Sequence, residues 1–134
     1  MPDHYHLLVK ILKERIFSKY INDVENSFTR FFNIKFERKG PLWQTDFRAV
    51  RIKSNEQLLH VSRYVHINPT TSFLVKKPED WKLSSYRDFI NDDKVLSEYI
   101  NEISIRSGKE YKKFIDDQID YQRKLKQIRR LTLD

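Results

Sequence analysis

Several features common in proteins are missing from this chain of 134 residues. It has no cysteine, which excludes disulfide bonds and metal sites built from thiolates. It has no apolar run of the roughly 18 residues that a membrane-spanning helix needs, so a membrane partner is not expected. Its start, Met1-Pro2-Asp3-His4, lacks the basic and then apolar pattern of a secretory signal peptide. These absences predict a cytoplasmic protein.

The composition that remains is basic and aromatic. The net charge is +7, and 39% of the residues are hydrophobic and 13% aromatic, which allows a modest core. A basic balance of this size suits a polyanionic partner, and nucleic acid is the first candidate. Many basic proteins bind no nucleic acid, so charge alone leaves the question open.

Two segments have the alternating pattern of β-strands. The segment 4–12 alternates so that His4 and His6 share one face while Tyr5 points to the other. The segment 47–52 alternates in the same way. Because two strands cannot form a stable sheet alone, the sequence predicts a sheet completed by a partner or by another segment.

Three regions are typical of helices. One begins near Ser18 or Asn22 and runs to about Phe36. Another opens at the capping box formed by Ser54 and Gln57 and should end near Asn68, before a proline. From residue 94 onward the chain is charged and helical, with Gly108 as an interruption. The apolar positions at helical spacing are Ile21, Val24, Phe28, Phe31 and Phe32, then Val95, Tyr99 and Ile103, then Tyr111, Phe114, Ile115, Ile119, Leu125 and Ile128.

Four side chains stand out for their chemistry. His4 and His6 share one face of the predicted strand, in position to bind one metal ion. Tyr64 and Asn68 lie one helical turn apart, where a phenol could act as nucleophile and an amide oxygen as metal ligand. The residues alone leave two alternatives open: a pair of histidines that ligates nothing, and a packed tyrosine beside a helix-terminal asparagine.

Four blocks of sequence, in order and in register over residues 1–90, resemble one family. Residues 1–9 resemble its Met-Pro-Asn/Asp-His-x-His-Leu-Leu signature, and 40–49 its Gly-x-Leu-Trp/Phe-Gln-x-x-Phe-Lys/Arg-Ala block. Residues 63–69 are similar to Arg-Tyr-Ile-x-x-Asn-Pro, and 81–86 to Trp-x-x-Ser-Ser-Tyr. The family is that of the HUH-class single-tyrosine transposases related to the REP-associated tyrosine transposases.

This resemblance implies a set of roles. His4 and His6 would be the histidine pair that binds a divalent metal ion, Mg²⁺ or Mn²⁺, with Asn68 as third ligand. Tyr64 would attack a phosphate of single-stranded or hairpin DNA and form a 5′-phosphotyrosine link. The resemblance therefore implies a metal-dependent, single-strand DNA transposase, provided that the fold is complete.

The resemblance also implies a fold. We expect an α+β, partial ferredoxin-like (RRM-like) HUH domain with few antiparallel strands in residues 1–92, followed by a helical basic extension in 93–134. Family members carry further strands before the Met-Pro motif, so we expect this chain to lack them. The strand at 4–12 should then lie at an exposed edge or pair with another chain, which favours a homodimer. Residues 70–72 read Thr-Thr-Ser, where relatives more often have Val-Arg-Ala.

Basic and aromatic residues suited to DNA are interleaved along the chain. Single-stranded DNA needs phosphate contacts together with aromatic stacking platforms. The alternative is a solvated basic face with the tryptophan in the core. The candidates are Arg38, Lys39, Trp43, Arg48, Arg51 and Arg63, with Arg129 and Arg130 in the tail.

Three functions compete at this stage. The first is a transposase that cleaves and rejoins single-stranded DNA during DNA transposition. The second is a catalytically inactive, truncated remnant that acts as a DNA-binding module. The third is a metal-dependent phosphodiesterase, which would turn over without a covalent intermediate.

Overall fold

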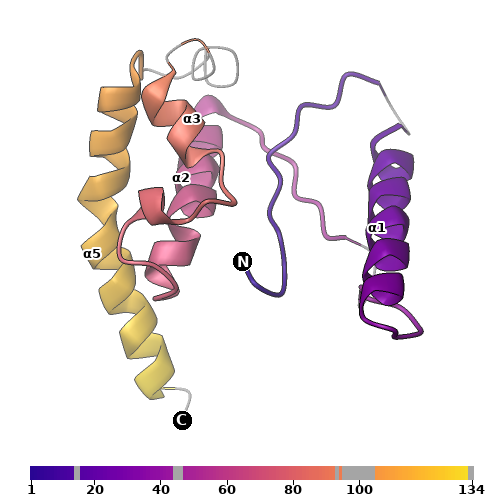
Figure 1. Cartoon of the computed structure of the whole chain (residues 1–134). Coiled ribbons are helices and arrows are strands. Elements are labelled where there is room, and N and C mark those ends of the chain that lie inside the picture. Colours follow the sequence, from indigo (N-terminus) through magenta and orange to yellow (C-terminus); the bar gives the residue numbers. More distant parts are fainter. Residues whose placement is uncertain (14–15, 44–46, 93, 95–104, 133–134) are drawn as a thin grey trace. The chain divides into compact units, whose positions relative to one another are not determined.

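The computed structural model describes residues 1–13, 16–43, 47–92, 94 and 105–132, with side chains in the last helix as far as residue 125. The elements are α1 (Ile16–Lys35), α2 (Asn55–Thr71), the 3₁₀ helix η1 (Pro78–Asp80), α3 (Tyr86–Asn91) and α5 (Gly108–Thr132) (Figure 1). They form two compact units. Unit 1 comprises Met1–Leu8 and Ile52–Asp134, and unit 2 comprises Val9–Arg51.

The regular structure is helical, which overturns the expected α+β, partial ferredoxin-like fold. Within the described ranges no residue belongs to a β-strand, including the two segments 4–12 and 47–52 for which alternation predicts strands. The described parts of both segments lack regular structure. A strand is stabilised by ladder hydrogen bonds to a neighbour, and an alternating pattern cannot supply that neighbour.

Unit 2 is built around the amphipathic helix α1. The predicted helix is confirmed, although it begins two residues before Ser18 and ends one before Phe36. Its only buried residue is Ile21. The indole nitrogen of Trp43 donates to the backbone oxygen of Glu25 at 3.1 Å, which ties the chain after the helix back onto α1.

Helix α2 begins as the capping box predicts. The side chain of Ser54 accepts from the backbone nitrogen of Gln57 at 3.1 Å. The predicted end near Asn68 is wrong, because α2 continues through Pro69 to Thr71. Proline removes one backbone donor and crowds the carbonyl four residues earlier, which disfavours a helix interior without excluding it. The buried residues 66–71 and a bond from the Ser72 nitrogen to the Asn68 oxygen at 2.9 Å hold the last turn in place.

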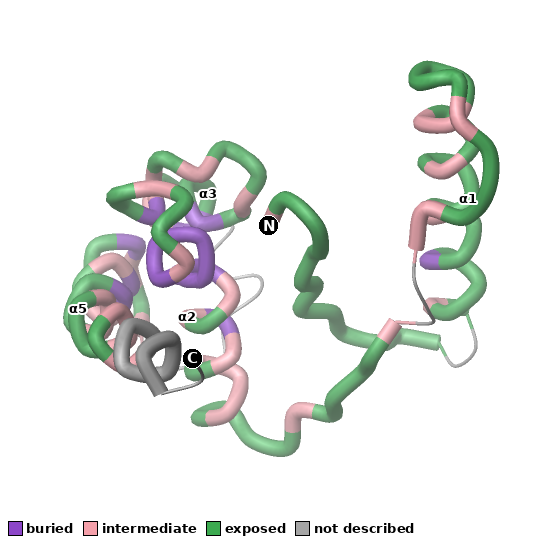
Figure 2. Tube along the Cα trace, turned by 90° about the horizontal axis from the view of Figure 1, so that it is seen from below, coloured by how far each residue is buried: buried purple, intermediate pink, exposed green. Residues whose placement is uncertain are grey.

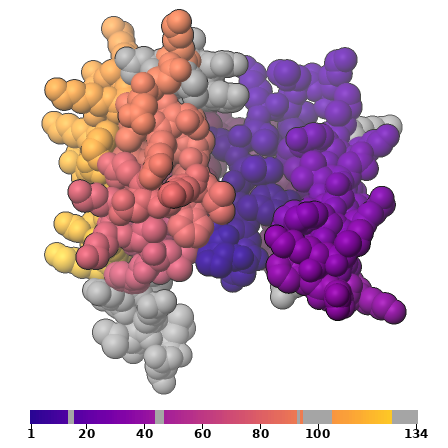
Figure 3. All heavy atoms as spheres, viewed as in Figure 1, coloured from indigo at the N-terminus to yellow at the C-terminus, as the bar shows by residue number. Residues whose placement is uncertain are grey.

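The core of unit 1 forms where α2, α3 and α5 meet. Helix α5 packs against both α2 and α3, and η1 also contacts α2 and α3. Figure 3 shows side chains of α3 and α5 in contact on one face of the molecule. In Figure 2 the buried residues gather on the helices of unit 1, whereas α1 carries one. The core residues are Ile67, Tyr86, Phe89, Tyr111 and Ile115.

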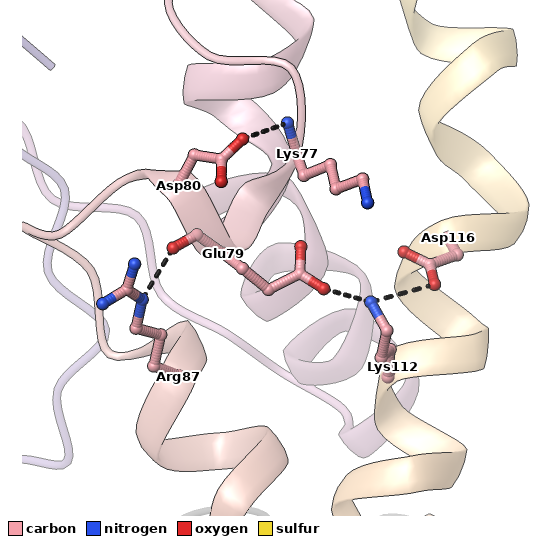
Figure 4. A network of polar contacts seen from close by, with 6 residues as sticks. All are labelled: Lys77, Glu79, Asp80, Arg87, Lys112 and Asp116. Carbon is pink, nitrogen blue, oxygen red and sulfur yellow. Dashed lines mark hydrogen bonds and ion pairs between the residues drawn. The ribbon is translucent and has the colours of Figure 1, made fainter.

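A polar network fastens η1 to α5. Lys112 on α5 pairs with the carboxylate of Glu79, and with Asp116 at 3.3 Å (Figure 4). Arg87 on α3 donates to the backbone oxygen of Glu79 at 2.6 Å. Three elements are therefore joined around one residue of η1.

The start of α5 requires a glycine. A Cβ at Gly108 would lie 2.4 Å from the backbone oxygen of Ile90, so α3 and α5 approach more closely there than a side chain allows. The predicted apolar stripe from Tyr111 to Ile119 faces the core. The other predicted stripe, Val95, Tyr99 and Ile103, lies outside the described residues. Among the described residues, none of the helices combines the length and the apolar character of a membrane span.

Candidate active site

Helix α2 places two of the predicted functional side chains one turn apart. Tyr64 is 57% exposed, so its phenol can meet a ligand from solvent. Asn68 is 4% exposed, and its side chain lies at the buried end of the helix. The i, i+4 spacing puts both on one face, as the sequence predicts.

The N-terminal segment brings the histidines to this face of α2. The amide nitrogen of Asn68 donates to Nε2 of His6 at 3.0 Å, across 62 positions of sequence. The ring centroids of His6 and Tyr64 are 5.7 Å apart, and those of His4 and His6 are 5.1 Å apart. The structure thus gathers His4, His6, Tyr64 and Asn68 into one cluster, while their roles as ligands and nucleophile stay predictions.

The electrostatics of the cluster favour neutral imidazole at His6. Burial lowers the pKa of His6, and the neighbouring His4 and the N-terminal amino group lower it further. A neutral imidazole has the lone pair that metal coordination requires. Next to it, Nδ1 of His4 lies 2.6 Å from a carboxylate oxygen of Asp3, and this hydrogen bond lowers the pKa of Asp3.

Two residues in contact with the cluster are absent from the sequence-based prediction. Asp3 pairs with His4, and carboxylates often orient histidines in this way. Ser72 donates through its hydroxyl to the side-chain oxygen of Asn68 at 3.2 Å. Their sequence signals are weak: an acidic residue beside a histidine, and a serine four residues after an asparagine.

The opposite side of α2 is anchored by a buried polar network. His66 Nδ1 lies 2.7 Å from the hydroxyl of Tyr111 on α5, and Nε2 lies 3.0 Å from Ser85. The Tyr111 hydroxyl donates to Ser62 at 3.0 Å. Because Tyr111 uses its proton for Ser62, the Nδ1 atom of His66 must carry a proton and donate it to the Tyr111 oxygen. Burial lowers the pKa of His66 to about 4, so near neutral pH the ring carries this one proton and is neutral.

Arg63 precedes Tyr64 but packs toward α5. Its guanidinium lies 4.3 Å from the ring centroid of Phe114, and it contacts Nδ1 of His60 at 2.8 Å. Burial lowers the pKa of Arg63. His60 contacts Arg63, and its Nε2 atom lies 3.9 Å from a carboxylate oxygen of Glu56. These contacts are to residues outside the cluster around Tyr64.

Most of the predicted DNA-binding residues lie in unit 2. Arg38 donates to the side chain of Asn33 at 2.9 Å and to the backbone of Pro41 at 3.1 Å. Trp43 is half-buried against α1, and its ring centroid is 6.1 Å from that of Phe28. Lys39, Arg48 and Arg51 are exposed. The side chains of Arg129 and Arg130, on α5, lie outside the described residues.

Comparison with known proteins assigns the N-terminal half of the chain to a family. A family model described as "Transposase IS200 like" matches residues 1–68. The matched range contains His4, His6, Tyr64 and Asn68, and it ends at the last of them. Comparison with curated proteins finds no match, and comparison with solved structures also finds none.

Proposed function

Because this chain belongs to the IS200-like transposase family, we propose that it binds single-stranded or hairpin DNA and cleaves and rejoins it through Tyr64. One observation carries the proposal. His6 and Asn68, distant in sequence, are in hydrogen-bond contact, and the His6 ring lies beside the exposed phenol of Tyr64. A phenol, an imidazole and an amide are therefore together, and the phenol is exposed to solvent.

The proposed step is a phosphoryl transfer to tyrosine. Oη of Tyr64 attacks phosphorus, the bond from phosphorus to the 3′ oxygen breaks, and a 5′-phosphotyrosine with a free 3′-OH results. The phenol loses one proton and the 3′ oxygen gains one, so protons balance. Strand joining reverses the step with a 3′-OH as nucleophile, and it needs no further energy source. Since the reference pKa of tyrosine is about 10, nearby positive charge must stabilise the phenolate.

His4, His6 and Asn68 would hold a divalent metal ion, Mg²⁺ or Mn²⁺. Their donor chemistry fits: imidazole nitrogens suit transition metals, amide oxygen suits Mg²⁺ and Mn²⁺, and His6 and Asn68 are already in contact. Two imidazoles and an amide are ligands without formal negative charge, so they leave the charge of the cation to act on phosphate. When bound, it would neutralise and polarise the scissile phosphate. Among the residues that the structure describes, no three His, Cys, Asp or Glu side chains are grouped so that they could hold a metal ion, so the amide of Asn68 is essential to this proposal.

Unit 2 would supply much of the DNA surface. Its residues 9–51 contain ten Lys and Arg against five Asp and Glu, so this third of the chain carries most of the net charge of +7. Cations next to aromatic rings suit a single strand, which needs phosphate contacts and stacking platforms. The proposed contacts are Arg38, Lys39, Trp43, Arg48 and Arg51, together with Arg63, Arg129 and Arg130 from unit 1.

A homodimer is part of the proposal. Large apolar side chains are exposed at Leu7, Val9, Ile11 and Leu12, in the segment with strand-like alternation. Neighbouring exposed apolar side chains of this kind favour association with another chain. Light scattering of the purified protein should give twice the monomer mass, and a monomer at micromolar concentration would contradict the dimer.

A matched pair of tyrosines tests the nucleophile. Tyr64 and Tyr121 are 57% and 58% exposed, so Tyr64→Phe and Tyr121→Phe remove equivalent hydroxyl groups. Each variant is incubated with labelled hairpin DNA and Mn²⁺ or Mg²⁺, and the products are separated on a denaturing gel. We expect a covalent adduct with wild type and Tyr121→Phe, no adduct with Tyr64→Phe, and equal DNA binding by all three.

The other outcomes separate the competing functions. DNA binding by the wild type with no adduct favours the inactive DNA-binding module. Cleavage with turnover but no adduct favours the phosphodiesterase. An adduct that persists in Tyr64→Phe shows that another residue is the nucleophile.

A further inference from the structure

Ser72 stands directly after α2, at the end that carries Asn68. Its backbone nitrogen donates to the Asn68 carbonyl at 2.9 Å, and its hydroxyl donates to the Asn68 side-chain oxygen at 3.2 Å. The second bond leaves the amide nitrogen pointing at His6, where it donates to Nε2 at 3.0 Å. Ser72 therefore sets which end of the amide faces the imidazole.

This orientation is the opposite of the one that metal binding requires. An amide nitrogen has no free lone pair, so Asn68 can ligate a cation only through its oxygen. That oxygen now faces Ser72. For it to face a cation held by His6, the amide must turn end for end, which directs its NH₂ group toward Ser72.

A serine hydroxyl can pair with the amide in either orientation. It donates to an amide oxygen and accepts from an amide NH₂ group. An alanine at this position could do neither. At a site as buried as Asn68, an amide without a partner is costly, so the hydroxyl lowers the cost of turning.

We propose that Ser72 is a positioning residue that pairs with the Asn68 amide in both orientations. Without metal, the amide donates to His6 and Ser72 donates to the amide oxygen. With metal, the oxygen turns toward the cation and Ser72 accepts from the amide nitrogen. This role rests on the metal site of the proposed function. Its effect on the tautomer of His6, however, can be measured in the metal-free protein.

The tautomer of His6 is the first measurement. While Nε2 accepts from Asn68, the ring proton must be on Nδ1, and long-range ¹⁵N–¹H spectra distinguish the two ring nitrogens. His6→Gln assigns the signals by removing them. We expect the Nδ1–H form in wild type and in Ser72→Thr, which keeps the hydroxyl. In Ser72→Ala the amide loses its second partner, and a substantial Nε2–H population should appear.

The second measurement is the binding of Mn²⁺ alone, which is detected as the loss of the electron paramagnetic resonance signal of the free ion. Removing a residue that orients a metal ligand typically weakens binding by roughly 10- to 100-fold, and we expect a loss in this range for Ser72→Ala. Ser72→Thr should stay within about twofold of wild type. Thr71→Val is the matched control, because its hydroxyl donates at 3.2 Å to the Asn68 backbone instead of the amide, and it should also bind normally.

The outcomes distinguish this role from the proposed function. If Ser72→Ala keeps the wild-type tautomer and Mn²⁺ affinity, the role of Ser72 is overturned while the metal site stands. If wild type itself binds no Mn²⁺, the metal site falls, and the role of Ser72 falls with it. If Thr71→Val weakens binding as much as Ser72→Ala does, the effect belongs to the helix end as a whole, which also overturns the proposal.

Discussion

The two units differ in how they use their apolar residues. Unit 1 buries Ile67, Tyr86 and Ile115 between three helices, and it covers the polar atoms of His66 with hydrogen bonds. Unit 2 has one long helix that buries Ile21 and leaves apolar side chains such as Phe31 exposed. Stability should therefore reside in unit 1, which also holds the candidate site, whereas unit 2 offers surface.

The largest expected effect is on the core of unit 1. Tyr111→Ala removes a fully buried ring and its bonds to His66 and Ser62, and it should lower the free energy of unfolding by about 3–5 kcal/mol. Tyr121→Ala makes the same change at an exposed site of the same helix, and it should stay within about 0.5 kcal/mol. Urea unfolding followed by circular dichroism measures both. Equal losses would show that α5 has no specific inner face.

The two glycines give a second contrast between the units. Gly108→Ala forces a Cβ against the backbone of Ile90, so α3 and α5 must move apart, and we expect a loss of up to about 3 kcal/mol. At Gly40→Ala, nothing lies within 4 Å of the new Cβ, and the cost comes from the φ of +97° alone, about 1 kcal/mol. The unfolding temperatures of the two variants measure which substitution destabilises the protein more. A more destabilised Gly40→Ala would reverse the contrast.

The pH dependence of stability should be dominated by His66. Its pKa falls from 6.5 to about 4 on folding, so between these values the unfolded chain binds a proton that the folded chain excludes. Stability is therefore complete above pH 6.5 and is lost as the pH falls toward 4, with about 2 kcal/mol lost between pH 7.5 and pH 5. His66→Gln should remove this component from urea unfolding curves. If the variant keeps the pH dependence of the wild type, titratable groups other than His66 cause that dependence.

The smallest effect is expected on the exposed face of α1. Phe31→Ala should change the free energy of unfolding by less than about 0.5 kcal/mol, because the ring is exposed in the folded chain as it is in the unfolded one. Phe89→Ala is the matched substitution in unit 1, and it should cost about 3 kcal/mol. A large loss at Phe31 would mean that another chain or segment covers α1, and the contrast between the units would then fail.

The sequence predicts helices and the spacing of side chains along them. It fails where the structure depends on residues that are distant in the sequence. Helical periodicity finds α1, and the Ser54 cap finds the start of α2. The strands are wrong because ladder partners cannot be seen in an alternating pattern. The cluster of His6, Tyr64 and Asn68 follows from the motifs. The contacts that orient it, such as Ser72 on the amide, depend on rotamers, and the pairing of His66 with Tyr111 spans 45 positions.

Arg123 has a consequence for the thermodynamics of DNA binding. It donates from Nη2 to the carbonyl of Lys76 at 2.8 Å and from Nε to that of Thr70 at 3.4 Å, just beyond the end of the candidate site. Lys112 is similarly committed to Glu79 and Asp116. Counterion release counts only the cations that neutralise phosphates, with a slope of about −0.7 in log K against log salt for each phosphate of a single strand. Groups already bound to carbonyls and carboxylates add little to that slope. The slope should therefore reflect mainly exposed cations of unit 2 such as Lys39, Arg48 and Arg51, and it should be far smaller than all 26 basic residues would give.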